Sequence, residues 1–220
     1  METKTNNKIK NIIIGFLKAV GIILAILIGY VLGSLPFALI IGKVFYNTDV
    51  RLHGSGNLGG SNTGRVLGKK AGITVMVLDV AKVVVAFTIT SLLKYQLSSI
   101  ILAGCFATIG HCYPIFANFK GGKAVSTLYG FLFGCMIYVF HDPLVFFLPL
   151  GVFLLTLYIT KIVAISSIVS SVVSTVYVYI INDNMLINIA SLAITVLLTY
   201  RHRANIKRMI EGNENKITWM

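Results

Sequence analysis

The residues that could do chemistry gather in three short polar segments, each beside long apolar runs. The first is the loop at residues 51–70, RLHGSGNLGGSNTGRVLGKK, which contains six glycines. Glycine allows positive φ and close backbone approach, so successive N–H groups can converge on an anion. Arg65, Lys69 and Lys70 would supply the countercharge. The composition predicts a phosphate-binding loop at a membrane surface; the alternative is a basic loop whose glycines only make turns.

The second segment, GHCYPIFANFKGGKAV, places two lysines around a glycine pair at the start of an expected helix. Lys123 directly follows Gly121 and Gly122. Backbone N–H groups at a helix N-terminus, together with a lysine, can hold an anion. Lysines that only anchor a helix end at the membrane surface are the alternative. The segment therefore predicts a second phosphate site.

The third segment, RHRANIKRMIEGNENK, follows the last apolar run. His202 and Asn205 are three residues apart and so share one face of a helix. A histidine in this place would, alone, be an ordinary interfacial residue. Beside two anion-binding loops, His202 becomes a candidate proton carrier, because imidazole titrates near neutral pH.

Membrane helices must position these segments. Of the 220 residues, 56% are hydrophobic and only 12% are charged, yet the net charge is +12. These values exclude an ordinary soluble domain, and no basic module with interleaved aromatic residues predicts nucleic-acid binding. Cys105, Cys112 and Cys135 lie in apolar contexts and are expected to be small buried hydrophobes. We expect an all-α integral membrane protein with one polytopic domain, residues 1–220.

Seven apolar runs predict seven transmembrane helices. They cover about residues 12–46, 71–93, 97–116, 126–140, a fifth run that ends near 160, 163–181 and 185–200. The polar stretches outside them are the N-terminal residues 1–10, the loops 51–70 and 117–124, and the tail 201–220. Pro36 is expected to kink the first helix. Asp79 and Lys82, three residues apart in the second, are expected to form a structural ion pair, because charges within a span are costly.

Basic residues divide unequally between the two faces that seven spans define. One face collects Lys43, Arg51, Arg65, Lys69, Lys70, Lys120, Lys123, Lys161, Arg201, Arg203, Lys207, Arg208 and Lys216. The loops of the other face hold only Lys94. By the positive-inside rule the first face, with the C-terminus and all three polar segments, is cytoplasmic. Lys4, Lys8 and Lys10 would lie on the opposite face, which argues against this orientation.

Two nucleotide-binding motifs are excluded by their surroundings. Gly54, Gly56 and Gly59 spell G-x-G-x-x-G, but membrane spans flank the loop in place of a βαβ unit. Ala124 follows Gly122 and Lys123 where a P-loop requires serine or threonine. No histidine begins an H-x-x-x-x-D box, which argues against the peripheral acyltransferases that use this box. No histidine cluster predicts a metal site.

Together with GSLPFALIIGKVFY, the three segments resemble the bacterial acyl-phosphate:glycerol-3-phosphate acyltransferase family. The resemblance implies a seven-helix enzyme of the bacterial cytoplasmic membrane. It implies transfer of a fatty acyl group from acyl phosphate to the 1-hydroxyl of glycerol 3-phosphate, which gives lysophosphatidic acid for phospholipid biosynthesis. It further implies a cytoplasmic active site, no metal or other cofactor, and an acyl-phosphate-producing enzyme as a partner at the membrane.

The resemblance also implies roles for individual residues. The catalytic assignments are His202, Asn205 and Ser55, and Glu214 is a supporting residue. The substrate and phosphate assignments are Arg65, Lys123, Gly56, Asn57, Asn62, Gly121, Gly122 and Ser167. The chain departs from the family pattern at Ala124, where the family has glycine, and at Ala164, where it has serine.

Acyl phosphate is an activated donor, so positioning and charge stabilisation should carry most of the rate. His202, oriented by Asn205, or a substrate phosphate would accept the proton of the attacking hydroxyl. Direct transfer is preferred over an acyl-enzyme on Ser55, because no base adjoins that serine in sequence. A transporter of a phosphorylated solute is one alternative, and would have polar or broken segments at the bilayer midplane. An inactive relative, suggested by Ala124 and Ala164, is the other.

Overall fold

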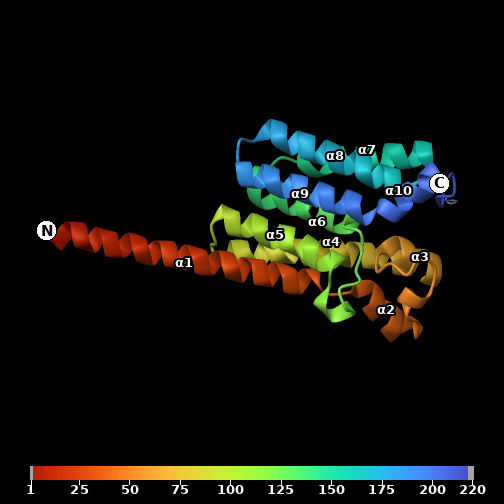
Figure 1. The fold of residues 1–220 in the computed structure, drawn as a ribbon, viewed down its shortest axis with the longest axis horizontal. Coiled ribbons are helices and arrows are strands. Elements are labelled where there is room, and N and C mark those ends of the chain that lie inside the picture. The colour runs from red at the N-terminus through yellow and green to blue at the C-terminus, as the bar shows by residue number, and fades with distance from the viewer. Residues whose placement is uncertain (1, 218–220) are drawn as a thin grey trace.

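The computed structural model describes residues 2–217, with side chains from residue 9 onward, and this part of the chain is helical without strands (Figure 1). The α-helices are α1 (Glu2–Gly33), α2 (Phe37–Tyr46), α3 (Gly60–Leu67), α4 (Lys69–Leu92), α5 (Leu97–Cys112), α6 (Val125–Cys135), α7 (Leu144–Thr160), α8 (Val163–Ile181), α9 (Met185–Arg201) and α10 (Arg203–Ile210). Short 3₁₀ turns η1 (Val50–Leu52) and η2 (Ile115–Ala117) and a π turn η3 (Met136–Phe140) complete them. The all-α prediction is confirmed. The predicted polar segment 1–10 continues α1 from Glu2, and the side chains of residues 1–8 lie outside the description.

Among the described residues, four segments are long and apolar enough to cross a bilayer: Ile9–Tyr46, Lys69–Leu92, Leu97–Ala117 and Val163–Ile181. The pair α9 and α10, bent by 54°, makes a fifth candidate. Two further apolar helices, Val125–Phe140 and Leu144–Thr160, are shorter, and lie alongside the long ones in Figure 1. The structure therefore supports a multi-pass membrane protein, and seven crossings remain a prediction.

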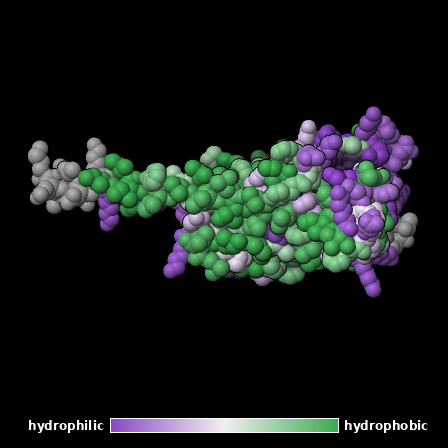
Figure 2. Space-filling view, turned by 90° about the horizontal axis from the view of Figure 1, so that it is seen from below, coloured by the Kyte–Doolittle hydropathy of each residue, from purple (hydrophilic) through white to green (hydrophobic). Residues whose placement is uncertain are grey.

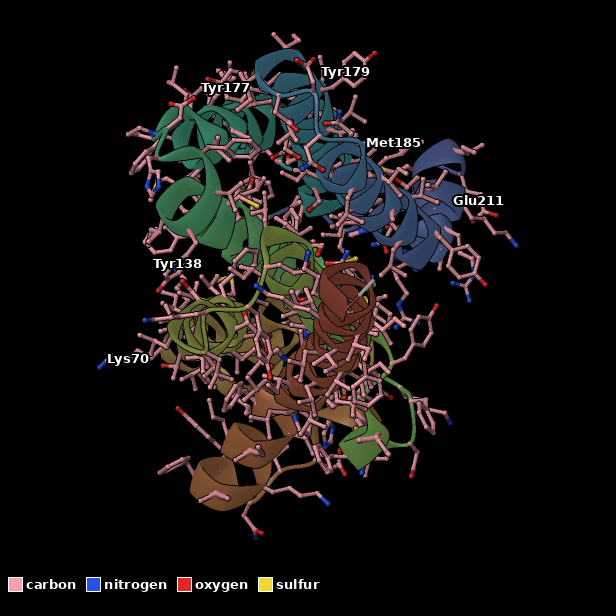
Figure 3. The ribbon with its side chains drawn as sticks, turned by 90° about the vertical axis from the view of Figure 1, so that its left-hand side faces the viewer. Lys70, Tyr138, Tyr177, Tyr179, Met185 and Glu211 are labelled. Carbon is pink, nitrogen blue, oxygen red and sulfur yellow. The ribbon has the colours of Figure 1, made fainter. Side chains whose placement is uncertain are left out.

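The helices form two groups, which Figure 3 shows nearly end-on. In one group α1 packs along α5, and α4 packs on α5 and α6; in the other α7 packs on α8, and α8 on α9. The buried ring of Phe87 lies between α4, α5 and α6, with its centroid 5.7 Å from that of Phe131. A Cβ at Gly104 or Gly134 would overlap the Phe87 ring. Small residues let these helices approach closely, as is common between membrane helices.

The first apolar run is broken at Pro36, as the sequence predicts. α1 ends at Gly33 and α2 begins at Phe37, because proline lacks the N–H that a continuous helix needs. The carbonyl of Leu35, inside this break, accepts a hydrogen bond from Lys82 Nζ at 3.0 Å. The break therefore gives α4 a backbone partner for a cationic side chain.

Hydrophilic side chains gather at one end of the molecule, while its flanks are apolar (Figure 2). In Figure 1 that end carries α2, α3 and α10, and the connections from η3 to α7 and from α8 to α9 lie at the opposite end. Many large apolar side chains on the flanks are exposed, among them Leu27, Val77, Leu155 and Ile180. Such a surface is suited to hydrocarbon rather than water. The three polar segments of the sequence thus meet at one polar end.

Candidate active site

The glycine-rich loop is held in shape by Asn62, which lies on α3 and is almost fully buried. Its Oδ1 accepts from the N–H of Ser55 at 2.8 Å and from the Ser55 hydroxyl at 3.1 Å. Its Nδ2 donates to the carbonyls of Val50 at 3.0 Å and His53 at 3.3 Å. The amide of Asn62 is therefore fully used within the loop. We propose for it a loop-holding role in place of the phosphate contact expected from the sequence.

Positive φ at Gly54 and Gly56 (59° and 65°) lets the loop turn tightly over Asn62. Ser55, between them, is exposed, and Asn57 is partly so. Arg65 extends from the last turn of α3; its side chain is exposed and makes no hydrogen bond or ion pair with any residue from 9 to 217. The loop therefore presents the Ser55 hydroxyl and the Arg65 guanidinium at the polar end.

The glycine pair before Lys123 is clamped from two sides. The N–H groups of Gly121 and Gly122 donate to the carbonyls of Cys112 at 3.2 Å and His111 at 3.0 Å, both at the end of α5. Arg201, the last residue of α9, donates from Nη2 to the Gly121 carbonyl and from Nε to the Gly122 carbonyl, each at 3.0 Å.

This clamp corrects one sequence-based expectation. The N–H groups of Gly121 and Gly122 already have protein acceptors, so they do not form the anion cradle that the sequence suggested. The glycines are needed for space instead. A Cβ at Gly121 would overlap the His111 carbonyl, and a Cβ at Gly122 would overlap the His111 ring. The pair thus serves to bring the backbone against α5 and to aim Lys123.

Lys123 heads a chain of charged and amide groups that joins α6 to α10 and the tail. Its Nζ donates to Asn205 Oδ1 at 2.6 Å, and Asn205 Nδ2 donates to Glu214 Oε1 at 2.6 Å. Arg208 Nε donates to the other carboxylate oxygen of Glu214 at 2.8 Å. The Glu214 side chain is only 7% exposed. The second and third polar segments, 82 residues apart at the Lys123–Asn205 bond, are therefore joined as the sequence predicts.

Burial lowers the pKa of Lys123, and the charges of Arg208, Arg201 and Arg65 lower it further, while Glu214 opposes them. The positive charge of Arg65, in the first segment, therefore acts on the charge of Lys123, in the second. Several cations so close together, with a single carboxylate among them, favour the binding of an anion.

His202 occupies the bend between α9 and α10 and is 3% exposed. Its Nδ1 lies 2.8 Å from the Leu198 carbonyl. A carbonyl only accepts, so Nδ1 carries the proton, and in the neutral ring Nε2 is left with a lone pair. Burial lowers the pKa of His202 to about 4, and nearby Lys123 and Arg201 add to this effect. The ring is therefore neutral at physiological pH.

The orientation of His202 differs from the sequence-based expectation. Leu198 holds the imidazole, whereas the side chain of Asn205 is used by Lys123 and Glu214. The chain also turns at His202, whose φ and ψ of −93° and 4° end one helix and begin the next. The helical face that His202 and Asn205 were expected to share is thus interrupted. Both residues nevertheless belong to the same end of α9 and α10.

The tail returns to the α7–α8 turn. The N–H of Ile217 donates to the Lys161 carbonyl at 2.8 Å, and Glu214 lies between that contact and α10. Ser167, on α8, is buried, and its hydroxyl donates to the Val163 carbonyl at 2.7 Å within its own helix. Its assignment to the phosphate remains a prediction.

Ala124 adopts the left-handed conformation, with φ 65° and ψ 4°, immediately before α6. This conformation explains the glycine that the family pattern has there, because only glycine adopts it without strain. The Ala124 side chain is fully buried in the main core. The chain therefore keeps the backbone turn after Lys123 in spite of the substitution.

Two residues that position this site were not singled out from the sequence. Arg201 was counted only among the basic residues, although it clamps both glycine carbonyls. His111 was not considered, although it carries both a carbonyl partner and a ring surface for Gly122. Neither pattern is visible locally, because each contact joins residues distant in the chain. The predicted burial of Cys105, Cys112 and Cys135 is confirmed.

These features define a class: a multi-pass helical membrane protein that gathers cations around the half-buried Lys123 at its polar end. Residues 23–212 match the family model described as glycerol-3-phosphate acyltransferase. The chain belongs to this family.

Relatives of known name support the assignment. The chain is 42% identical over 196 residues to the glycerol-3-phosphate acyltransferase of Geobacillus kaustophilus, covering 89% of this chain and 96% of the relative. It is 42% identical over 199 residues to the protein of the same name from Bacillus subtilis, covering 90% and 99%. The crystal structure of PlsY (YgiH), an integral membrane glycerol 3-phosphate acyltransferase, in its glycerol 3-phosphate form is similar with a TM-score of 0.81 at 30% identity, covering 90% and 96%. Its lysophosphatidic acid form has a TM-score of 0.80.

Proposed function

We propose that this protein transfers a fatty acyl group from acyl phosphate to the 1-hydroxyl of glycerol 3-phosphate and so forms lysophosphatidic acid. The observation that carries the proposal is the match of family and structure: the related structures are described as holding glycerol 3-phosphate in one case and lysophosphatidic acid in the other. The cationic chain around Lys123 gives this molecule a place for the phosphate of such a ligand.

Lys123 and Arg65 are the proposed phosphate-binding cations. Lys123 Nζ donates one hydrogen bond to Asn205, and the Arg65 side chain has no hydrogen-bond or ion-pair partner within residues 9–217. Both cations therefore have N–H donors left for a phosphate. The first turn of α3 adds backbone N–H groups without intrahelical acceptors, on the helix that carries Arg65. Gly56 and Asn57 lead into this turn and would let phosphate approach the backbone. Ser167 would have to turn from Val163 to join them.

The reaction needs one proton acceptor. The 1-hydroxyl oxygen attacks the acyl carbonyl carbon, the bond from that carbon to the phosphate oxygen breaks, and inorganic phosphate leaves. The hydroxyl proton passes to Nε2 of His202 or to a phosphate oxygen. Phosphate monoesters have a second pKa of about 6, above the value of about 4 that burial gives His202. A free phosphate monoester is thus more basic than the buried ring, and we propose that phosphate takes the proton while His202 orients the hydroxyl by accepting its hydrogen bond.

Direct transfer fits the surroundings of Ser55. Its hydroxyl donates to Asn62 Oδ1, an acceptor that does not take up a proton, and no histidine or carboxylate is hydrogen-bonded to it among residues 9–217. An acyl-enzyme on Ser55 would need such a base. Ser55 is instead proposed to turn its exposed hydroxyl from Asn62 Oδ1 and to donate to a substrate oxygen.

The proposed setting is the bacterial cytoplasmic membrane, with seven crossings and with the polar end and C-terminus in the cytoplasm. The excess of basic residues at the polar end supports this orientation. The acyl chain of the donor would lie against the apolar flank while its phosphate stays at the polar end. An enzyme that makes acyl phosphate would be the upstream partner.

Acyl transfer by the purified protein tests the proposal. Labelled glycerol 3-phosphate is offered with palmitoyl phosphate and, separately, with palmitoyl-CoA, and Lys123→Ala and His202→Ala variants are assayed alongside. Lysophosphatidic acid is expected only from acyl phosphate, with a large loss in both variants. A folded sample that forms no product would contradict the enzymatic proposal. Uptake of labelled glycerol 3-phosphate into vesicles would then test the transporter alternative.

A further inference from the structure

A cluster of three ionisable side chains, which we name the buried charge cluster, lies inside the helix bundle. Its contact with the residues assigned to substrate is at the backbone of Gly122. Its members are Asp79 and Lys82 of α4 and His111 of α5, and they are 1%, 4% and 6% exposed. Charged groups within membrane spans are costly and are commonly retained for a role. The contacts of the cluster indicate which role this is.

Lys82 is the centre of the cluster. Its Nζ lies 2.7 Å from Asp79 Oδ1, 3.0 Å from the Leu35 carbonyl and 3.0 Å from His111 Nδ1. A lysine ammonium has three hydrogens and no acceptor, so these three partners use all of its donors. The contact to His111 then requires Nδ1 to accept, which places the proton of the neutral ring on Nε2. Asp79 Oδ1 lies 3.5 Å from the same Nδ1, so Lys82 and Asp79 together hold the orientation of His111.

His111 connects the cluster to the glycine pair. Its carbonyl accepts from the Gly122 N–H, and its ring lies so close to Gly122 that a Cβ there would overlap it. The next residue, Lys123, is the cation that binds Asn205. An unbroken series of contacts therefore runs from the break at Leu35, through Lys82 and His111, to the backbone that carries Lys123.

We propose that Asp79, Lys82 and His111 are positioning residues that fix Gly122 and so aim Lys123 at the phosphate of the substrate. This inference rests on the proposed function. It extends the expectation of a structural ion pair, since it predicts an effect on substrate binding that a merely structural pair would not have. Misplacement of a substrate-binding group by about 1 Å can cost on the order of 100-fold in rate.

The test removes both charges together. Replacing one partner leaves an unpaired buried charge and endangers folding, whereas replacing both with apolar residues of similar size is often neutral for stability. The double variant Asp79→Leu/Lys82→Met is therefore compared with the wild type. Thr90→Val is the matched control, because Thr90 is a fully buried polar residue of the same helix whose hydroxyl donates only to carbonyls within α4.

Three quantities are measured: the Tm in detergent, the KM for glycerol 3-phosphate with palmitoyl phosphate as donor, and the rise in Tm that glycerol 3-phosphate produces without the donor. In the double variant we expect a Tm close to that of the wild type, a KM about tenfold higher and a smaller rise in Tm with ligand. Thr90→Val should keep the wild-type KM. A folded double variant with the wild-type KM would overturn the proposal.

If the double variant does not fold, the KM of His111→Asn tests the same positioning role. Asparagine keeps a short side chain that can accept from Lys82 but removes the ring surface that supports Gly122. We expect a folded protein with a raised KM, and an unchanged KM again overturns the proposal. Wild-type protein that makes no lysophosphatidic acid would instead contradict the proposed function, and the rise in Tm with glycerol 3-phosphate would still show whether the cluster controls phosphate binding.

Discussion

Asn205 stands between Lys123 and Glu214, accepting from the lysine through Oδ1 and donating to the carboxylate through Nδ2, each at 2.6 Å. The Asn205 amide thus links Lys123 to Glu214 by hydrogen bonds, and the two charged groups do not pair directly. A lysine held in this way keeps donors available for a ligand, whereas a direct ion pair would use its charge. The arrangement makes the carboxylate a support for Lys123 rather than a competitor of the substrate.

Neutralising Glu214 should weaken this support. In Glu214→Gln we expect a several-fold rise in the KM for glycerol 3-phosphate and a smaller change in kcat, because the ion pair with Arg208 is replaced by a weaker hydrogen bond to a neutral amide. Steady-state kinetics with acyl phosphate at saturation measures both constants. Glu211→Gln is the control, since Glu211 is exposed and its ion pair among residues 9–217 is a long one, to Lys207 at 3.8 Å. Equal effects in both variants would contradict the assignment.

Arg201 should not be replaceable by lysine. The guanidinium holds two carbonyls at once through Nε and Nη2, a fork that a lysine ammonium does not reproduce. We expect Arg201→Lys to lower kcat/KM by about tenfold or more, with a loss of stability of about 1–3 kcal/mol from the unsatisfied Gly121 and Gly122 carbonyls. Arg203→Lys serves for comparison, because Arg203 is exposed and, among residues 9–217, its guanidinium bonds the Tyr200 carbonyl and lies over the Tyr200 ring. Wild-type kinetics in Arg201→Lys would show that the clamp is dispensable.

The neutral state of His202 predicts a pH dependence of stability. Its pKa is about 4 in the folded protein against 6.5 for the ordinary side chain, so the unfolded chain binds the proton more readily. The contribution of His202 to stability is therefore complete above about pH 6.5 and is lost as pH falls toward 4, with a slope of at most about 1.4 kcal/mol per pH unit. His202→Asn, which can still donate to the Leu198 carbonyl, should have a flatter Tm profile in this window. Parallel profiles for the two proteins would argue against the buried neutral ring.

The same pKa separates the two proton acceptors. If phosphate takes the proton, the acid limb of kcat/KM should follow the second ionisation of phosphate near pH 6. If His202 of the free protein takes it, activity should persist toward pH 4, where that ring becomes protonated. Rate measurements from pH 4.5 to 8 distinguish the two, and the phosphate result is the one we expect.

Ala124 predicts a small effect of Ala124→Gly and a large one of Ala124→Val. Glycine relieves the left-handed conformation, worth about 1–2 kcal/mol, but gives up a buried methyl group worth about 0.8 kcal/mol and gains unfolded-state freedom. These contributions nearly cancel, so we expect a change of less than about 1 kcal/mol. A β-branched valine adds both strain and bulk, and should destabilise by about 2 kcal/mol or more. Thermal unfolding of both variants checks the order, and a tolerant Ala124→Val would show that the turn is not constrained.

The sequence predicted the helices and the meeting of the polar segments because both depend on local pattern. Long apolar runs indicate spans, Pro36 predicts the first break, and the number of runs between the polar segments predicts that the segments meet at one end of the molecule. The partners of the groups could not be predicted. Whether Gly122 offers its N–H to a ligand or to His111 depends on how α5 approaches α6, and that approach is a property of packing.

Asn62 illustrates the same limit. A polar amide in a glycine-rich loop suggests a ligand contact, yet burial turned it inward to satisfy two carbonyls and the Ser55 N–H. The tautomer of His202 likewise depends on a carbonyl one helical turn earlier. In each case the residue type was recognised from the sequence, and its acceptor or donor was decided by the surrounding backbone.

The contact of Ile217 with Lys161, together with Glu214 beneath it, has a consequence for biogenesis. These residues follow every apolar helix within residues 2–217, so the Lys123–Asn205–Glu214 series is completed only after those helices have been synthesised. A chain that has been synthesised only as far as α10 would have the Arg201 clamp on Gly121 and Gly122 but would lack the Glu214 carboxylate. The site would therefore be completed late, when the segment that carries Glu214 folds onto the water-facing end of the helix bundle.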